Sequence, residues 1–108
     1  MKTFKQTLIL LISSTALLGS YSAIAADGAE LYTSKGCTAC HGPDAKTAIM
    51  PTYPNLAGQN AEYALAQMLD IKSGARNNGQ TAVMKGIVAG ISDEELGVLA
   101  KYLASLPE

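Results

Sequence analysis

The chain has 108 residues, with eight Lys and Arg against nine Asp and Glu, which gives a formal net charge of −1. A chain of this length forms one domain. The near balance of charge, without a run of basic residues, excludes a nucleic-acid-binding protein, because such proteins need a clustered positive face.

The N-terminal segment has the pattern of a secretory signal peptide. Lys2 and Lys5 precede a mostly apolar run over residues 7–18, and Ala23-Ile24-Ala25 supplies the small residues of a cleavage site. The alternative is an uncleaved membrane anchor, which the shortness of the run disfavours, since a spanning helix takes about 20 apolar residues. We therefore expect a signal peptide over residues 1–25, cut after 25 or 26. The domain of residues 26–108 would then work in the periplasm without stable membrane insertion.

A short helix is predicted next, over residues 27–34. Asp27 is a suitable N-cap, and Gly36 is a suitable residue to end the helix.

The segment Cys37-Thr38-Ala39-Cys40-His41 follows at once, and it has the spacing of a c-type haem attachment site. Cys37 and Cys40 would bond covalently to the two vinyl groups of one haem, and His41 would bind its iron from one face. A haem c of this kind is attached outside the cytoplasm, which agrees with the predicted export.

Two other interpretations of the cysteine pair stay open. A disulfide or a redox dithiol also suits an exported protein, although no strand flanks the pair as in a thioredoxin-like site. A structural zinc site needs four ligands, and the two Cys and one His of the chain fall one short. A buried haem would also supply the apolar volume that a small domain without Trp or Phe needs for its core.

The middle of the chain combines a stiff loop with a second predicted helix. Two prolines and Gly58 make residues 51–59 an irregular loop. A helix is predicted over residues 60–73, with Asn60 as its N-cap and Gly74 after its last turn.

Residues 77–90 are predicted to form a loop, and this loop carries the candidate for the second iron ligand. His41 is the only histidine of the chain, so two histidines cannot bind the iron. Met84 can reach the opposite face of a haem, whereas Met50 follows His41 closely and Met68 belongs to the apolar stripe of the second helix. We therefore predict Met84 as the second axial ligand, with hydrophobic packing as its alternative role.

The last predicted helix covers residues 92–106. Ser92 and Glu95 have the spacing of a capping box. Leucines recur at helical spacing along this segment and predict its buried face. No segment has a convincing strand pattern, so the sequence predicts an all-α fold with three main helices and ordered loops.

The ordered set of motifs resembles a class I c-type cytochrome, and specifically a single-domain relative of the cytochrome c4/c5 type. The segments that carry the resemblance are residues 37–42, 54–59, 82–84, 90–95 and 99–103. Cytochromes c′ differ, because their haem motif lies near the C-terminus. The resemblance implies a small class I cytochrome c fold around one covalently bound haem.

The resemblance also implies roles for single residues. The backbone carbonyl of Pro54 would accept a hydrogen bond from Nδ1 of His41, and Leu56 would pack on the haem. Gly28 in the first helix would allow a close crossing with the last helix near Tyr102.

These inferences predict a one-electron carrier between redox protein donors and acceptors. His/Met ligation raises the reduction potential and leaves no open position for a substrate, so we expect no catalytic residue and no enzyme activity. The expected state is a monomer or a weak dimer. The alternatives are a haem subunit of a larger oxidoreductase, for example with a flavoprotein dehydrogenase, and an open-site haem enzyme or sensor.

Overall fold

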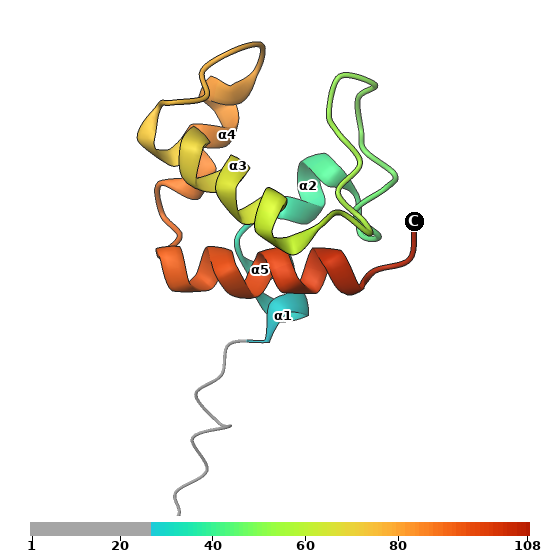
Figure 1. Ribbon diagram of the computed structural model, residues 1–108. Helices are drawn as coiled ribbons and strands as arrows, with labels where there is room; N and C mark the ends of the chain where they lie inside the picture. The colour runs from blue at the N-terminus through green and yellow to red at the C-terminus, as the bar shows by residue number, and fades with distance from the viewer. Residues whose placement is uncertain (1–26) are drawn as a thin grey trace, which may run out of the picture.

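The computed structural model describes residues 27–108, which fold into helices joined by turns and loops (Figure 1). The helices are α1 (Gly28–Ser34), α2 (Cys37–His41), α3 (Ala61–Ser73), α4 (Thr81–Val88) and α5 (Asp93–Ser105). The all-α prediction is confirmed within these residues. The signal peptide predicted over residues 1–25 lies outside the described part. Among the described helices, none has the length and apolar character that crossing a membrane requires.

The three helices predicted from sequence are present, and their caps explain where they begin. The Asp27 carboxylate accepts a hydrogen bond from the amide of Ala29 at 2.9 Å, and the side chain of Asn60 accepts one from the amide of Tyr63 at 3.0 Å. Ser92 begins α5 with a complete capping box. These contacts satisfy amide groups that the first turn of a helix leaves without partners.

The structure also contains two helices that the sequence prediction missed. The haem motif itself forms the single turn α2, and Met84 lies on α4, not in the predicted loop. Gly79, Gly86 and Gly90 suggested a loop there, because a glycine inside a helix costs about 1 kcal/mol relative to alanine. Packing of α4 against α3 overrides this local preference.

The N- and C-terminal helices cross closely, as the family resemblance implies. A Cβ atom at Gly28 would collide with Cβ of Tyr102, so only a glycine permits this approach. The rings of Tyr32 and Tyr102 pack beside the crossing with centroids 5.7 Å apart. Figure 1 shows α1 beneath α5, at the end of the molecule away from α4.

The core lies between α5 and the helices that pack on it. Its largest fully buried side chains are Leu96, Leu99 and Val88. The hydroxyl of Tyr32 donates a hydrogen bond to the carbonyl of Gly42, which joins α1 to the turn after α2. Burial, with smaller contributions from nearby groups, raises the pKa of Tyr32 to about 12, so this hydroxyl remains a donor at neutral pH. The core therefore fixes α2 and α3 relative to α5, and with them the site described below.

The capping box of α5 predicts an acid-dependent loss of stability. Hydrogen bonds from the Ser92 backbone and side chain hold the pKa of Glu95 below its ordinary value of 4.5. This stabilisation is fully present above pH 4.5 and is lost as the pH falls through the lower pKa of the folded state. Glu95→Gln keeps a capping side chain but removes the charge, so thermal melts should show a lower Tm at neutral pH and a weaker decline below pH 4.5.

Glu94→Gln is the matched control for that experiment, because it removes the same charge from the same first turn without touching the capping box. An equal effect of both substitutions on the acid branch would contradict the role given to Glu95.

Candidate haem-binding site

The structure contains an apolar cavity of about 380 Å3 that reaches the His41 side chain. Its walls come from the loop of residues 52–59, from α3, and from the segment of residues 76–87. In Figure 1 this loop, in green, and α4, in orange, rise on opposite sides of the molecule with α3 between them. Cavities of this size commonly hold a small organic ligand or cofactor.

His41 is fixed in one orientation at the base of the cavity. Its side chain is buried, and its Nδ1 lies 3.1 Å from the backbone carbonyl oxygen of Pro54. If Nδ1 carries the proton and donates it to that carbonyl, Nε2 is left as the ligand atom. Burial lowers the pKa of His41, against a smaller opposite effect of the Pro54 contact, and so favours the neutral imidazole. Neutral imidazole is the form that binds a metal.

The two thiols lie on α2. Cys37 is one helical turn before His41, and Cys40 directly precedes it in the chain. Both Cys37 and Cys40 are free and partly buried. Cys40 lines the cavity, while Cys37 packs against the core. Burial raises the pKa of the Cys37 thiol. The described residues contain no cluster of three or more His, Cys, Asp or Glu that would hold a metal ion by itself.

Met84 reaches the cavity from α4, a different element from the one that carries His41. Met68 on α3 also lines the cavity, so the structure brings two thioethers to it. Met50 does not line it and is 41% exposed. The predicted ligand Met84, on α4, and the residue assigned to packing, Met68, on α3, therefore line the same cavity.

The loop that carries Pro54 and Leu56 is held by backbone hydrogen bonds. The carbonyl of Ala45 accepts from the amides of Leu56 at 2.7 Å and Ala57 at 3.1 Å, and the amide of Gly58 donates to Leu103 at 2.9 Å. Ala45 is fully buried with a φ of 60°, an uncommon conformation for a residue with a Cβ. These contacts fix the Pro54 carbonyl against His41 and place Leu56 in the cavity wall.

The residues present fit a covalently bound haem. His41 supplies a buried, oriented imidazole, Cys40 lines the same apolar cavity with its free thiol, and Met68 and Met84 bring thioethers to it. The second free thiol, that of Cys37, lies on the same short helix α2 and packs against the core. Imidazole and thioether sulfur are both established haem iron ligands. The carbonyl that orients the imidazole is a typical outer contact of a metal-bound histidine.

Sequence reasoning missed one polar contact in the cavity wall. Nη1 of Arg76 donates a hydrogen bond to Oε1 of Gln67 at 3.0 Å, and both residues line the cavity. The only sequence signal was Gly74 at the end of α3. Its φ of 88° turns the chain back so that the segment carrying Arg76 meets the helix again.

Comparison with known proteins places the chain in a family. The family model of cytochrome c matches residues 25–107. The chain is 34% identical over 103 residues to cytochrome c-553 of Nitratidesulfovibrio vulgaris, with 94% of this chain and 99% of that protein covered. It is 41% identical over 99 residues to a thiosulfate dehydrogenase electron acceptor of Stutzerimonas stutzeri, with 85% of this chain and 44% of that protein covered.

The solved structure of reduced cytochrome c4 from Pseudomonas stutzeri has the same fold. The two structures superpose with a TM-score of 0.66 at 32% sequence identity, covering 80% of this chain and 50% of the other. The chain thus spans about half the length of this protein and less than half of the Stutzerimonas stutzeri acceptor. The haem motif, the fold and these relatives agree: the chain belongs to the cytochrome c family and is a class I c-type cytochrome of the c4 type.

Proposed function

We propose that the protein is a periplasmic monohaem cytochrome c that carries single electrons between redox proteins. In this proposal, residues 1–25 form a cleaved signal peptide. Cys37 and Cys40 hold one haem c covalently, and His41 and Met84 are its axial ligands. The haem supplies a one-electron iron couple, and the protein residues bind it, orient the imidazole and exclude water.

The observation that carries the proposal is the pairing of His41 with Met84 in a single apolar cavity. Each comes from a different helix, so the two can approach an enclosed ring from separate sides. Ligation by both leaves the iron no open position for a substrate, and thioether sulfur favours the reduced iron. Among the described residues that line the cavity, none is an aspartate, a glutamate or a lysine, and Cys40 is the one cysteine.

The surface around the cavity suits a brief contact with another protein. The large exposed apolar side chains of the described residues include Val83 and Ile87 of α4, and Ile49 and Met50 of the loop after α2. Val83 and Ile87 also line the cavity. Redox encounters use small interfaces, and an apolar face beside the cofactor would bring two redox centres close without a long-lived complex.

The names of two relatives suggest a class of redox partner as a hypothesis. One relative is named for accepting electrons from thiosulfate dehydrogenase, and another of that name comes from Thiomonas intermedia. We propose a dehydrogenase of this class as the electron donor.

The visible spectrum of the purified periplasmic protein tests the proposal. We expect a low-spin c-type spectrum in both oxidation states, with the weak red band of a methionine–Fe(III) bond in the oxidised protein. Thiosulfate dehydrogenase supplied with thiosulfate should then reduce the protein, while thiosulfate alone should not. A colourless protein from cells that mature other c-type cytochromes would disprove the proposal, and a high-spin spectrum would favour an open-site enzyme or sensor.

The exposed apolar side chains also favour a second candidate, an electron-transfer subunit of a larger oxidoreductase. A permanent interface would bury Ile49, which is 65% exposed, and Val83, which is 60% exposed. Gel filtration of the native periplasmic extract separates the two functions. A carrier elutes as a lone small protein, whereas a subunit elutes with a stoichiometric partner.

A further inference from the structure

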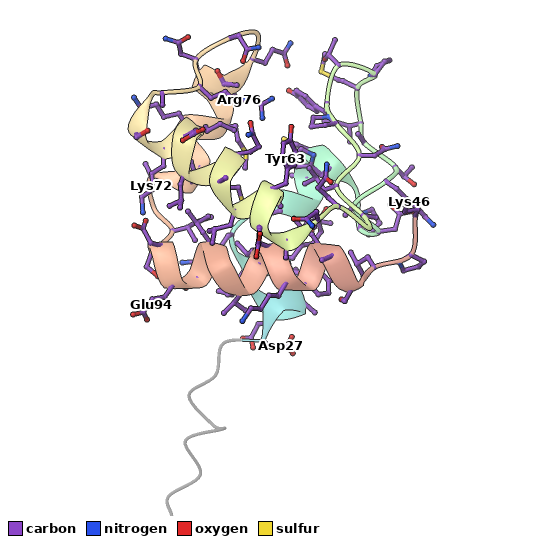
Figure 2. The ribbon with its side chains drawn as sticks, in the orientation of Figure 1. Asp27, Lys46, Tyr63, Lys72, Arg76 and Glu94 are labelled. Atoms are coloured by element: carbon purple, nitrogen blue, oxygen red, sulfur yellow. The ribbon has the colours of Figure 1, made fainter. Side chains whose placement is uncertain are left out.

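Lys72 joins the last turn of α3 to the turn that follows α4. Its Nζ donates to the backbone carbonyl of Ile91 at 2.6 Å and to Oδ1 of Asp93 at 2.9 Å. Ile91 is buried and lies between the end of α4 and the beginning of α5. In Figure 2, Lys72 lies between the end of α3 and the beginning of α5. One ammonium group therefore binds the connection between α4 and α5 to α3.

The turn that Lys72 holds is continuous with α4. The amide of Ile91 donates at 3.0 Å to the carbonyl of Val88, which is the last residue of α4. The side chains of Val88 and Ile91 are both buried in the core. A displacement of the Ile91 carbonyl would therefore also displace the end of the helix that carries Met84.

Helix α4 depends on such contacts because its own sequence holds it weakly. It has eight residues, whereas a helix shorter than about 12–15 residues is marginal in water by itself. It contains Gly86, and its N-cap residue Gln80 makes no side-chain cap contact. Its main helical neighbour among the described helices is α3. Contacts that join α4 to α3 therefore decide how firmly Met84 stays in the cavity wall.

The two bonds of Lys72 differ in their expected contribution. The Asp93 side chain is 72% exposed, and an exposed ion pair contributes little to stability. The Ile91 carbonyl belongs to a buried residue, and a buried acceptor that loses its donor costs free energy. A charged donor also makes a stronger hydrogen bond than a neutral one. The bond to the Ile91 carbonyl is therefore the one that holds the turn.

We propose that Lys72 is a positioning residue for the iron ligand: its bond to the Ile91 carbonyl holds the end of α4 against α3 and so keeps the Met84 sulfur on the iron. The inference rests on the proposed function, which makes Met84 the second axial ligand. Local opening of one unit takes less free energy than global unfolding. Without this bond, α4 should leave the iron more often while the rest of the domain stays folded.

The rate at which the oxidised holoprotein binds cyanide tests this role, because cyanide reaches the iron only when the methionine has left it. Lys72→Met keeps an unbranched side chain but removes the donor, and it should raise the rate at low cyanide concentration by about tenfold. Lys72→Arg keeps a charged donor and should restore part of the wild-type rate.

Lys35→Met is the matched control. Lys35 follows α1, and its side chain is 31% exposed against 28% for Lys72. It pairs at 3.8 Å with Glu95, another first-turn carboxylate of α5. The substitution removes the same charge beside the same helix without removing the bond to Ile91, so it should leave the cyanide rate near the wild-type value. A rate in Lys72→Met no higher than in Lys35→Met would overturn the inference.

Hydrogen exchange of the holoproteins locates the opening. In Lys72→Met, the amides of α4 and of residues 89–91 should exchange faster, while those of α1 should keep their wild-type rates. Equal acceleration in all helices would mean that Lys72 stabilises the domain as a whole, and it would overturn the inference.

Two further outcomes keep the inference separate from the proposed function. If Lys72→Met does not accumulate as holoprotein, Lys72→Gln beside Lys35→Gln decides by the same measurements. A wild-type oxidised protein without the methionine–Fe(III) band would disprove the ligand assignment of the proposed function, and the inference with it. A wild-type band with equal cyanide rates in the Lys72 and Lys35 variants would disprove only the role of Lys72.

Discussion

Met84→Leu is expected to lower the reduction potential sharply and to open the iron to carbon monoxide and cyanide. Leucine keeps nearly the volume of methionine, so α4 should still pack on α3. Any fall in the reduction potential then reports the loss of the sulfur ligand. The choice of axial ligands sets the reduction potential of a haem within a range of about 0.8 V. We therefore expect the redox equilibrium to shift by more than tenfold, which is more than about 59 mV for one electron.

Met68→Leu is the matched control, because Met68 lines the same cavity and undergoes the same change. It should keep the methionine–Fe(III) band and stay closed to cyanide. If Met68→Leu lost the band while Met84→Leu kept it, the ligand would be Met68. If both variants kept it, neither assignment would stand.

How far the sequence predicts this fold depends on the kind of signal each element carries. Helices α1, α3 and α5 were predictable because a capping side chain marks each beginning, and the cap contacts at Asp27, Asn60 and Ser92 are present in the structure. Helix α4 was not, since Gln80 makes no side-chain cap contact there and the helix contains Gly86, a residue with low helix propensity. Its helical state depends on packing against α3, which is a long-range effect.

The site residues also differ in whether a local sequence pattern or a long-range contact places them. The cysteine pair and His41 were predictable because attachment of a haem demands a fixed local spacing. The contact between His41 and the Pro54 carbonyl was not derivable from spacing, and only the family resemblance indicated it. Gly74 alone did not identify Arg76 as a cavity residue, because the place of Arg76 depends both on the left-handed turn at Gly74 and on the contact with Gln67.

The protein without attached haem is expected to lack a stable tertiary structure. Cys37→Ser/Cys40→Ser removes both attachment points, keeps His41, and changes the cavity lining only at Cys40. An empty cavity costs about 24 cal/mol per Å3, so a volume of about 380 Å3 corresponds to an upper bound of about 9 kcal/mol. A mouth open to water reduces that cost. The whole domain has only about 4–12 kcal/mol of stability, at 0.05–0.15 kcal/mol per residue, so the two terms are comparable.

The loss of stability without haem should be largest in the helices that lie beside the cavity. Helix α4 packs on α3 beside the cavity, whereas the crossing of α1 and α5 at Gly28 lies away from it. We therefore expect no cooperative thermal transition in the double variant, with α4 amides exchanging fastest.

Thr38→Val is the matched control within the same motif. The Thr38 hydroxyl oxygen is buried without a hydrogen-bond partner among the described residues, so a valine of similar shape should leave stability unchanged or higher. Circular dichroism melts of the two variants beside the wild-type holoprotein make the comparison. A double variant that melts cooperatively near the wild-type Tm would mean that Leu96, Leu99 and the other core residues suffice to fold the domain. The haem would then contribute redox chemistry without contributing the core.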